Sequence, residues 1–480
     1  MSKTRPAPMR LTARIYTFVL ILVTLPLSSA SDNTTLACNN LQTLLDPSVV
    51  QFPPTSNDPN SAGNYTSTIT STWNLFNAEF TPTCIVFPRT SSDVQVAMKE
   101  IFDSDVNYAV KAGGHSAMKG WNNVDNGILI AFDYMNHISY DPIKDTITME
   151  PAIRWGEAVT ALESQGVAPV GGRVDDVGTG LLLGGGLSFL SPAHGFSADN
   201  FVELDVVLVN GTMVTATQTN EYADLFKSLK GGGNRFGIVT RYEVRAVHVG
   251  TKEDKNWFGG SIMYPEASFD ALAKAVLQYT QDNNDPNAAI LVYFGALVLP
   301  DNTLFSFAMA NLFHNNPSES LFNITFSPFL SIQPIISTTL GPLSYHDIAF
   351  SLTEPLPSNG HGQLFGATVL SSSPGSESEQ AYIDTVHQWI NFTKNEALYS
   401  ELNTTVLAFT PIPVSQIVVG RQRGGNVIDP PLEAYNAVQF QVTLKTGIKS
   451  VSREMEEARE VFFEKWGSSF TRITPLSKRV

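Results

Sequence analysis

Apolar residues in the first half of the chain follow two kinds of spacing, one typical of an α-helix and the other typical of β-strands. At 92–102 they recur with the spacing of an amphipathic helix. Ser92 and Asp93 stand at its start, where cap-forming residues are favoured. The apolar positions of this expected helix are Val94, Met98, Ile101 and Phe102. The other elements expected here are strands at 108–110, 127–131, 146–149 and 202–209 and a helix at 156–165. Together they predict an α+β unit.

The second half is expected to form a lobe of longer strands. Its predicted strands lie at 257–262, 289–298 and 304–310, with helices at 269–279 and 451–466. At 436–444 apolar and polar residues alternate, so Gln439 and Gln441 share one face of a strand. That face either meets solvent or lines a ligand cavity, and the pattern favours neither. Tyr293, within the apolar run 291–294, is a comparable candidate.

Glycine is concentrated in three clusters. The first, at 112–116, reads Ala-Gly-Gly-His-Ser and follows the expected strand at 108–110. The second, at 171–186, holds seven glycines in sixteen residues, and the third lies at 231–237. Adjacent glycines let a backbone adopt positive φ and approach a large ligand, and the first pair leaves His115 at the rim of such a site. Any one cluster alone could serve a simple chain reversal.

The order of these clusters, with Pro88-Arg89-Thr90 upstream and Ser197-Ala198-Asp199-Asn200 before the strand at 202–209, resembles a known family. It is similar to the FAD-binding domain of the vanillyl-alcohol oxidase and p-cresol methylhydroxylase (PCMH) superfamily, and above all to berberine-bridge-enzyme-like oxidases. The resemblance implies an α+β fold: a PCMH-type FAD-binding domain, and a substrate domain with an antiparallel sheet backed by helices. The implied boundaries are 31–80 for an N-terminal segment of the flavin domain, 81–250 for its main part, 251–450 for the substrate domain and 451–480 for a C-terminal helix and divergent tail.

The resemblance also implies how the first and third clusters hold FAD. In the family, the histidine at the position of His115 is bonded covalently to the flavin. The residues implied at the diphosphate are Gly113, Gly114 and Ser116. Those implied beside the adenosine part are Gly237, Ile238 and Val239.

In the second cluster, many relatives have a cysteine that forms a second bond to the flavin. Val174 stands at that position here, so the resemblance implies one covalent bond, through His115, with a non-covalent flavin as the alternative. Val177 corresponds to a residue that controls oxygen access in the family and resembles the oxidase version; ordinary packing is its other interpretation. Gly178 and Gly185 complete the implied cofactor contacts.

The end of the chain departs from the family pattern. Relatives usually have a Tyr-x-Asn-Tyr segment whose tyrosine acts as catalytic base, and it is missing after the expected helix at 451–466. The candidates left for catalysis are Tyr293, Gln439 and Gln441. The resemblance implies an oxidase that removes a hydride from an alcohol or amine-like carbon of a metabolite or sugar and reduces O₂ to H₂O₂. The alternatives are a different electron acceptor, or a binding protein, with or without flavin, whose catalysis is lost or impaired.

The first thirty residues have the layout of a secretory signal peptide. Four cations precede the apolar run 15–27, and Ser28-Ser29-Ala30 suits a signal peptidase. The apolar run is short for a membrane span, so a soluble chain beginning near Ser31, secreted to the extracellular space, is expected rather than an anchored one. Six glycosylation sequons agree with that route: Asn33, Asn64, Asn210, Asn323, Asn391 and Asn403. Asn210 is the least favoured, because its Asn-Gly pair is typical of a hairpin turn.

Cysteine usage and charge narrow the chemistry further. Cys38 and Cys84 are the only cysteines, and in an oxidising compartment they are expected to form a disulfide. Removal of the signal peptide takes the formal net charge from −15 to −19, because it contains four cations and no acid. So acidic a chain repels polyphosphate, which excludes nucleic acid as the expected partner and leaves a small-molecule substrate.

Overall fold

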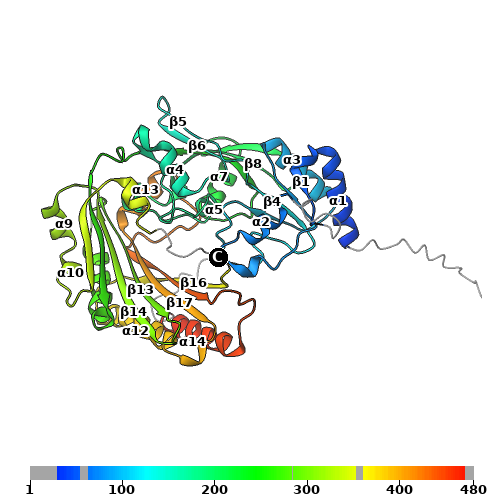
Figure 1. Ribbon diagram of the computed structural model, residues 1–480. Helices are drawn as coiled ribbons and strands as arrows, with labels where there is room; N and C mark the ends of the chain where they lie inside the picture. The colour runs from blue at the N-terminus through cyan, green and yellow to red at the C-terminus, as the bar shows by residue number, and fades with distance from the viewer. Residues whose placement is uncertain (1–29, 55–62, 284, 353–359, 471–480) are drawn as a thin grey trace, which may run out of the picture.

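The computed structural model describes residues 30–54, 63–283, 285–352 and 360–470, which form two lobes (Figure 1). We call residues 30–250 the N-terminal lobe and residues 251–470 the C-terminal lobe. The expected signal peptide, apart from Ala30, and the last ten residues of the tail lie outside the described ranges. Within those ranges no helix is both long and apolar enough to cross a bilayer.

The outer part of the N-terminal lobe is a mixed four-stranded sheet with the order β1-β2-β4-β3. Its strands are β1 (Val50–Gln51), β2 (Cys84–Val86), β3 (Tyr108–Lys111) and β4 (Ile128–Ala131). Strand β4 runs parallel to both β2 and β3. Helices α1 (Ala30–Leu44) and α3 (Ser91–Asp103) pack against each other, and their apolar residues share one core with β4. The short helix α2 (Tyr65–Thr70) leads into the turn Leu75–Asn77.

The predicted disulfide is confirmed: Cys38 in α1 is bonded to Cys84 in β2 across a separation of 46 residues. Both cysteines are fully buried. The bond therefore fixes the first described helix to the central part of this sheet.

Helix α3 begins slightly earlier than the sequence predicts. Its N-cap is Thr90, whose side chain accepts a hydrogen bond from Asp93 N while the Asp93 carboxylate accepts from Thr90 N. Val94, Met98 and Ile101 are buried as expected. Phe102, the fourth apolar residue in this spacing, is instead 53% exposed at the edge of the apolar face.

The inner part of the N-terminal lobe is a five-stranded antiparallel sheet with the order β5-β6-β10-β8-β9. Its strands are β5 (Ile138–Asp141), β6 (Thr146–Met149), β8 (Phe201–Val207), β9 (Met213–Thr217) and β10 (Ile238–Arg245). The predicted hairpin at Asn210 joins β8 to β9, with Gly211 at φ +80°. The other elements here are α4 (Trp155–Leu162), α5 (Gly180–Leu183), α6 (Ser191–His194), α7 (Ala223–Leu229) and the paired strands β7 (Val167–Ala168) and β11 (Val247–His248).

The C-terminal lobe is built on a seven-stranded antiparallel sheet with the order β15-β12-β14-β13-β17-β18-β16. Its strands are β12 (Trp257–Pro265), β13 (Ala288–Val298), β14 (Leu304–His314), β15 (Ser337–Leu343), β16 (Gln363–Ser371), β17 (Leu402–Ile412) and β18 (Tyr435–Leu444). The accompanying helices are α8 (Phe269–Asp282), α9 (Glu319–Thr325), α10 (Ser327–Leu330), α11 (Tyr345–Ala349), α12 (Ser376–Thr393), α13 (Val414–Gln422) and α14 (Arg453–Phe470).

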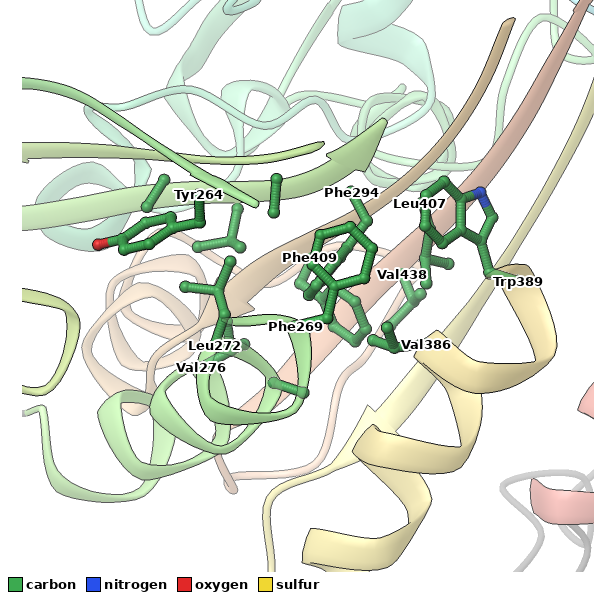
Figure 2. Close-up of a cluster of buried hydrophobic side chains, with 14 of the residues drawn as sticks. Tyr264, Phe269, Leu272, Val276, Phe294, Val386, Trp389, Leu407, Phe409 and Val438 are labelled. Carbon is green, nitrogen blue, oxygen red and sulfur yellow. The ribbon is translucent and has the colours of Figure 1, made fainter. Parts of the chain in front are cut away.

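Helices α8, α12 and α14 cover one face of this sheet (Figure 1). Figure 2 shows the core between them, where Phe269 of α8 and Trp389 of α12 meet Phe294 of β13. The rings of Phe269 and Phe294 lie edge to face with centroids 5.0 Å apart.

The other face of the sheet is turned toward the N-terminal lobe. An interlobe core joins them, with Val159 and Phe189 from the N-terminal lobe and Leu291, Phe313 and Ala408 from the C-terminal lobe. This second face is therefore the one that can meet a ligand held by the N-terminal lobe.

Candidate functional site

The three glycine clusters line one cavity of about 800 Å³ in the N-terminal lobe. Strand β3 delivers the first cluster, the segment before and through α5 supplies the second, and the residues before and in β10 supply the third. Nine of the eleven residues expected at the cofactor line this cavity: Gly113, Gly114, His115, Ser116, Val177, Gly178, Gly237, Ile238 and Val239. Segments separated by about 120 residues in sequence therefore form a single concave surface.

Backbone contact between glycines brings the first two clusters together. A Cβ atom on Gly113 would lie 2.8 Å from both N and Cα of Gly178, and a Cβ on Gly178 would meet Gly113 at the same distance. Two side chains cannot fit there. Gly180 and Gly233, by contrast, face open space, with no atom within 4 Å of an added Cβ. Both line the cavity, so the missing side chains leave room for a ligand.

The two remaining expected cofactor residues do not line the cavity. Val174 lies before the lining segment, which begins at Val177. Gly185 has φ +101°, and a Cβ there would lie 2.6 Å from Cδ1 of Ile428. Its neighbour Gly184 lines the cavity instead. In this structure the absent side chain at Gly185 makes room for a residue of the C-terminal lobe.

His115 lies against the flat ring of Trp73. The two rings are stacked, with centroids 4.7 Å apart and planes inclined by 18°. Burial and, to a smaller extent, the positive charge of Arg154 lower the pKa of His115 to about 4. The imidazole is therefore neutral at pH 7, with a lone pair on one ring nitrogen.

Hydrogen bonds to Gly114 O hold the turn that carries His115. This carbonyl accepts from Trp73 N at 3.1 Å and from Asn122 Nδ2 at 2.9 Å. Gly114 itself has φ +73°, which only glycine adopts without strain. The buried Lys111 Nζ donates to Ser71 O at 2.9 Å and ties the end of β3 to the segment before Trp73. Neither Trp73 nor Lys111 was expected at the site, since neither belongs to a glycine cluster.

Arg154 fastens the loop of the second cluster. Its Nη1 donates to Asp176 Oδ1 at 2.6 Å and also to the Asp176 carbonyl. The same atom would lie 3.8 Å from a Cβ on Gly113. Arg154 thus lies at the junction of the first two clusters, another contact that the sequence pattern did not reveal.

A buried polar network attaches the C-terminal lobe beside the second and third clusters. Asp199, of the Ser-Ala-Asp-Asn motif, accepts from Phe196 N and from Asn426 Nδ2, each at 2.9 Å. Lys230 Nζ lies 3.7 Å from the Asp199 carboxylate and donates to Arg423 O at 3.0 Å. Asp199 and Lys230 are both almost completely buried. The segment after α13 is therefore held directly against the clusters.

The three residues expected to act in catalysis lie on the sheet face that is turned toward the N-terminal lobe. Tyr293 is paired with Ala408, and Ala408 is paired with Gln439. Tyr293, Ala408 and Gln439 therefore form one row across β13, β17 and β18. Two strand spacings separate Tyr293 from Gln439, about 10 Å. Neither the Tyr293 hydroxyl nor the Gln439 amide has a hydrogen-bond partner among the described residues. Burial raises the pKa of Tyr293, which keeps its hydroxyl protonated at neutral pH.

Gln441 differs from Gln439. Its Nε2 lies 3.3 Å from Thr443 Oγ1 and 3.4 Å from Gln363 Oε1, so its donor is directed along the sheet. None of Tyr293, Gln439 and Gln441 is among the residues that line the 800 Å³ cavity. They are on the facing surface of the other lobe.

The chain is similar in sequence to FAD-dependent proteins. Residues 82–217 match a family model described as an FAD binding domain. An uncharacterized FAD-linked oxidoreductase from Arthroderma benhamiae is 29% identical over 426 residues, which cover 88% of this chain and 81% of the relative. The FAD-dependent monooxygenase macF from Penicillium terrestre is 31% identical over 379 residues, covering 77% of this chain and 68% of the relative.

Solved structures show the same fold at lower identity. A variant of berberine bridge enzyme superposes with a TM-score of 0.72 at 16% identity, covering 92% of this chain and 86% of that chain. A two-part α+β fold, with an antiparallel sheet backed by helices in its second part, is therefore a shared architecture, as the sequence predicted.

The residues of the cavity fit FAD. Its volume of about 800 Å³ lies within the range of sites for large ligands. Arg235 lines it and no aspartate or glutamate does, although the chain as a whole has a net charge of −15. A dinucleotide with an anionic diphosphate would thus meet backbone amides and a cation, without an opposing carboxylate.

Proposed function

The chain belongs to the FAD-linked oxidoreductases of the vanillyl-alcohol oxidase and PCMH superfamily, and from this premise we propose that it is an oxidase that takes a hydride from an alcohol or amine-like carbon. O₂ receives the two electrons and, with two protons, becomes H₂O₂. The observation that carries the proposal is the convergence of the three glycine clusters on one cavity with His115 in its wall.

His115 is the proposed attachment point for FAD. A neutral imidazole is a nucleophile, and burial together with Arg154 keeps this one neutral at physiological pH. Stacking on Trp73 holds the ring in one orientation. When bound, FAD supplies the two-electron acceptor for the substrate hydride. Gly180 and Gly233 leave the space for the cofactor, and Arg235 offers a cation to its diphosphate.

Tyr293 and Gln439 are proposed to receive the substrate. Both hold uncommitted polar groups on the sheet face opposite the N-terminal lobe. Beside them, β16 presents Phe365 and Val369, which are 38% and 40% exposed. An apolar substrate with one or two polar groups would be oriented by hydrogen bonds from the tyrosine hydroxyl and the glutamine amide. The hydroxyl of Tyr293 is also the first candidate to relay the substrate proton.

Anaerobic flavin reduction tests the reaction type. Purified full-length protein is mixed with alcohols and amines, and absorbance near 450 nm is followed. We expect a subset of alcohols or amines to bleach the flavin, and admission of air to restore the colour with one H₂O₂ per oxidised substrate. If bleached flavin is not reoxidised by air but is reoxidised by a quinone or dye, the enzyme is a dehydrogenase and the oxidase proposal is wrong.

Oxygen insertion is the second candidate, favoured by the name of macF and by the names of other matched relatives. Labelled ¹⁸O₂ separates the two reactions. A monooxygenase places one label in the product and releases the other in water, whereas the proposed oxidase leaves both labels in H₂O₂.

Secretion and glycosylation are proposed as the setting of this activity. They are supported by the signal-like first thirty residues, by the disulfide, and by the exposed side chains of Asn64, Asn323 and Asn391. In the Asn210 turn, the side-chain oxygen accepts from Thr212 N, which favours a structural role there. Mass spectrometry of the secreted chain should find Met1 removed and a mass decrease on deglycosylation; an intact Met1 contradicts the proposal.

A further inference from the structure

A second, much smaller cavity lies where the two lobes meet. It has a volume of about 20 Å³, enough for one occupant a little larger than a water molecule. The N-terminal lobe contributes Arg173 of the second glycine cluster and Ser191 of α6, and the C-terminal lobe contributes Thr410 of β17 and Gln416 of α13. None of these four residues lines the 800 Å³ cavity.

We call this small interlobe cavity the seam. Arg173 places a positive charge beside it without a counter-ion. Its guanidinium makes one hydrogen bond, from Nη1 to Thr410 Oγ1 at 2.9 Å, and lies 5.8 Å from the ring centroid of Phe189. It forms no salt bridge among the described residues, and no aspartate or glutamate lines the cavity. Burial lowers the pKa of Arg173 to about 10, so the group remains charged at pH 7. Most of its five donors have no protein acceptor, and desolvated cations ordinarily have one.

Three further side chains at the cavity, Gln416, Ser191 and Thr410, also present donors. The Nε2 atom of Gln416 is buried and has no hydrogen-bond partner in the part of the chain that the structure describes, and the residue is 1% exposed. Ser191 Oγ already accepts from Ser188 N at 3.0 Å, and Thr410 Oγ1 accepts from Arg173. Each hydroxyl therefore has its own proton left to donate. A cation, an amide N–H and two hydroxyl protons surround a space that contains no acidic group.

We propose that this seam is a binding site for a small monovalent anion, a halide or one carboxylate group, held by Arg173, Gln416, Ser191 and Thr410. A water molecule would accept hydrogen bonds from the donors but would not neutralise the charge of Arg173. A bound anion would do both. Because the ligands come from both lobes, the bound anion joins the second glycine cluster to β17 and α13.

The first test compares thermal unfolding of the full-length protein in sodium chloride, sodium bromide, sodium acetate and sodium gluconate at equal ionic strength. We expect the halides to raise the unfolding midpoint saturably, on the order of 2 °C, since a ligand that binds the folded state stabilises it. Acetate competing with chloride would identify a carboxylate as an accepted ligand; no effect of acetate would identify a free halide. If none of the four salts raises the midpoint saturably above its value in low-salt buffer, the proposal is overturned.

Variants assign the effect to the seam. Arg173→Met should abolish the halide dependence, whereas Arg453→Met, which removes an exposed arginine from α14, should leave it unchanged. Gln416→Glu places a carboxylate beside Arg173, so it should supply the missing charge and also abolish the dependence while the protein remains folded. A halide dependence that survives in Gln416→Glu contradicts the site. A bromide-containing crystal should show anomalous density beside Arg173, and water density there would contradict the proposal independently of any variant.

Discussion

At the scale of single residues, the position of a glycine decides what a side chain in its place would meet. Gly178 lies against Gly113, so a Cβ there would collide with backbone that cannot move aside. Gly180 is only two residues away, yet faces open space in the cavity. The two glycines therefore have different roles, one in joining the clusters and one in leaving room for FAD.

We predict that Gly180→Leu will fold but lose flavin. The new side chain would occupy the cavity, and overpacking of this kind costs about 1–3 kcal/mol, which weakens FAD binding roughly 5- to 150-fold, so the flavin content should fall. The ratio of absorbance at 450 nm to that at 280 nm measures this. Gly341→Leu is the control, because Gly341 also faces open space but lies in β15, and its flavin content should equal that of the wild type. Equal flavin in both variants would contradict the assignment of the cavity.

His194 predicts a pH dependence of stability. Burial, with a smaller contribution from Arg423, lowers the pKa of His194 to about 4, against about 6.5 in an unfolded chain. Between these values the unfolded state binds more protons. The contribution of neutral His194 to the free energy of unfolding is therefore fully present above pH 6.5. It is lost progressively as the pH decreases toward 4.

The glutamine in His194→Gln cannot titrate. The variant should therefore lose about 1–3 kcal/mol less stability than the wild type when the pH is lowered. Urea unfolding at pH 7.0 and pH 4.5 measures the difference for wild type and variant. The same loss of stability in both proteins would show that other groups are responsible.

At the scale of helices and strands, the elements that hydrophobic periodicity predicted are present, but others, among them α12, β10, β16 and β17, were not predicted. Glycine density indicated the segments that line the cavity. Val94, Met98 and Ile101 are buried as their spacing required, because a helix that packs on one side needs only local sequence to define its face. The cap at Thr90 was missed although its capping box with Asp93 is local, because the start of the helix was assigned to Ser92 and Asp93. The exposure of Phe102 depends on where α3 meets its neighbours, which its spacing does not reveal.

The disulfide between α1 and β2 should contribute substantially to stability. Closing a loop of 46 residues removes about 4 kcal/mol of unfolded-state freedom on the chain-entropy model. We predict that the double variant Cys38→Ser, Cys84→Ser lowers the free energy of unfolding in urea by about 2–5 kcal/mol. Flavin content should be retained, because neither cysteine lines the cavity. A variant as stable as the wild type would contradict this.

The buried Asp199–Lys230 pair should be the main polar attachment of the segment after α13. We predict that Asp199→Ala destabilises the protein by about 3–5 kcal/mol, since it leaves the buried Lys230 without its counter-ion and the Asn426 amide without its acceptor. Hydrogen exchange at 426–428 should increase in parallel. Asp103→Ala, which removes an exposed pair with Lys99, is the control and should change stability by less than about 1 kcal/mol. Similar effects in the two variants would show that burial of the pair is unimportant.

At the scale of the whole molecule, the sequence indicated many of the residues that line the candidate site. It indicated little about how the two lobes pack against each other. The glycine clusters and His115 were identified because backbone freedom and a rim histidine leave a local signature. Trp73, Arg154 and the contact of Ile428 with Gly185 were not, because they depend on long-range packing. Alternation placed Gln439 and Gln441 on one face of a strand, but it did not place Tyr293 beside them; only the register of β13, β17 and β18 brings Tyr293 into line with Gln439.

The central claim is that the three glycine clusters form one FAD site with His115 as its covalent attachment. Peptide mapping of the denatured, full-length protein tests it most directly. We predict one FAD per chain, bound to the peptide that contains His115 and lost from that peptide in His115→Ala. A yellow protein that releases all its flavin on denaturation would contradict the covalent bond, and a folded protein that never contains flavin would contradict the site itself.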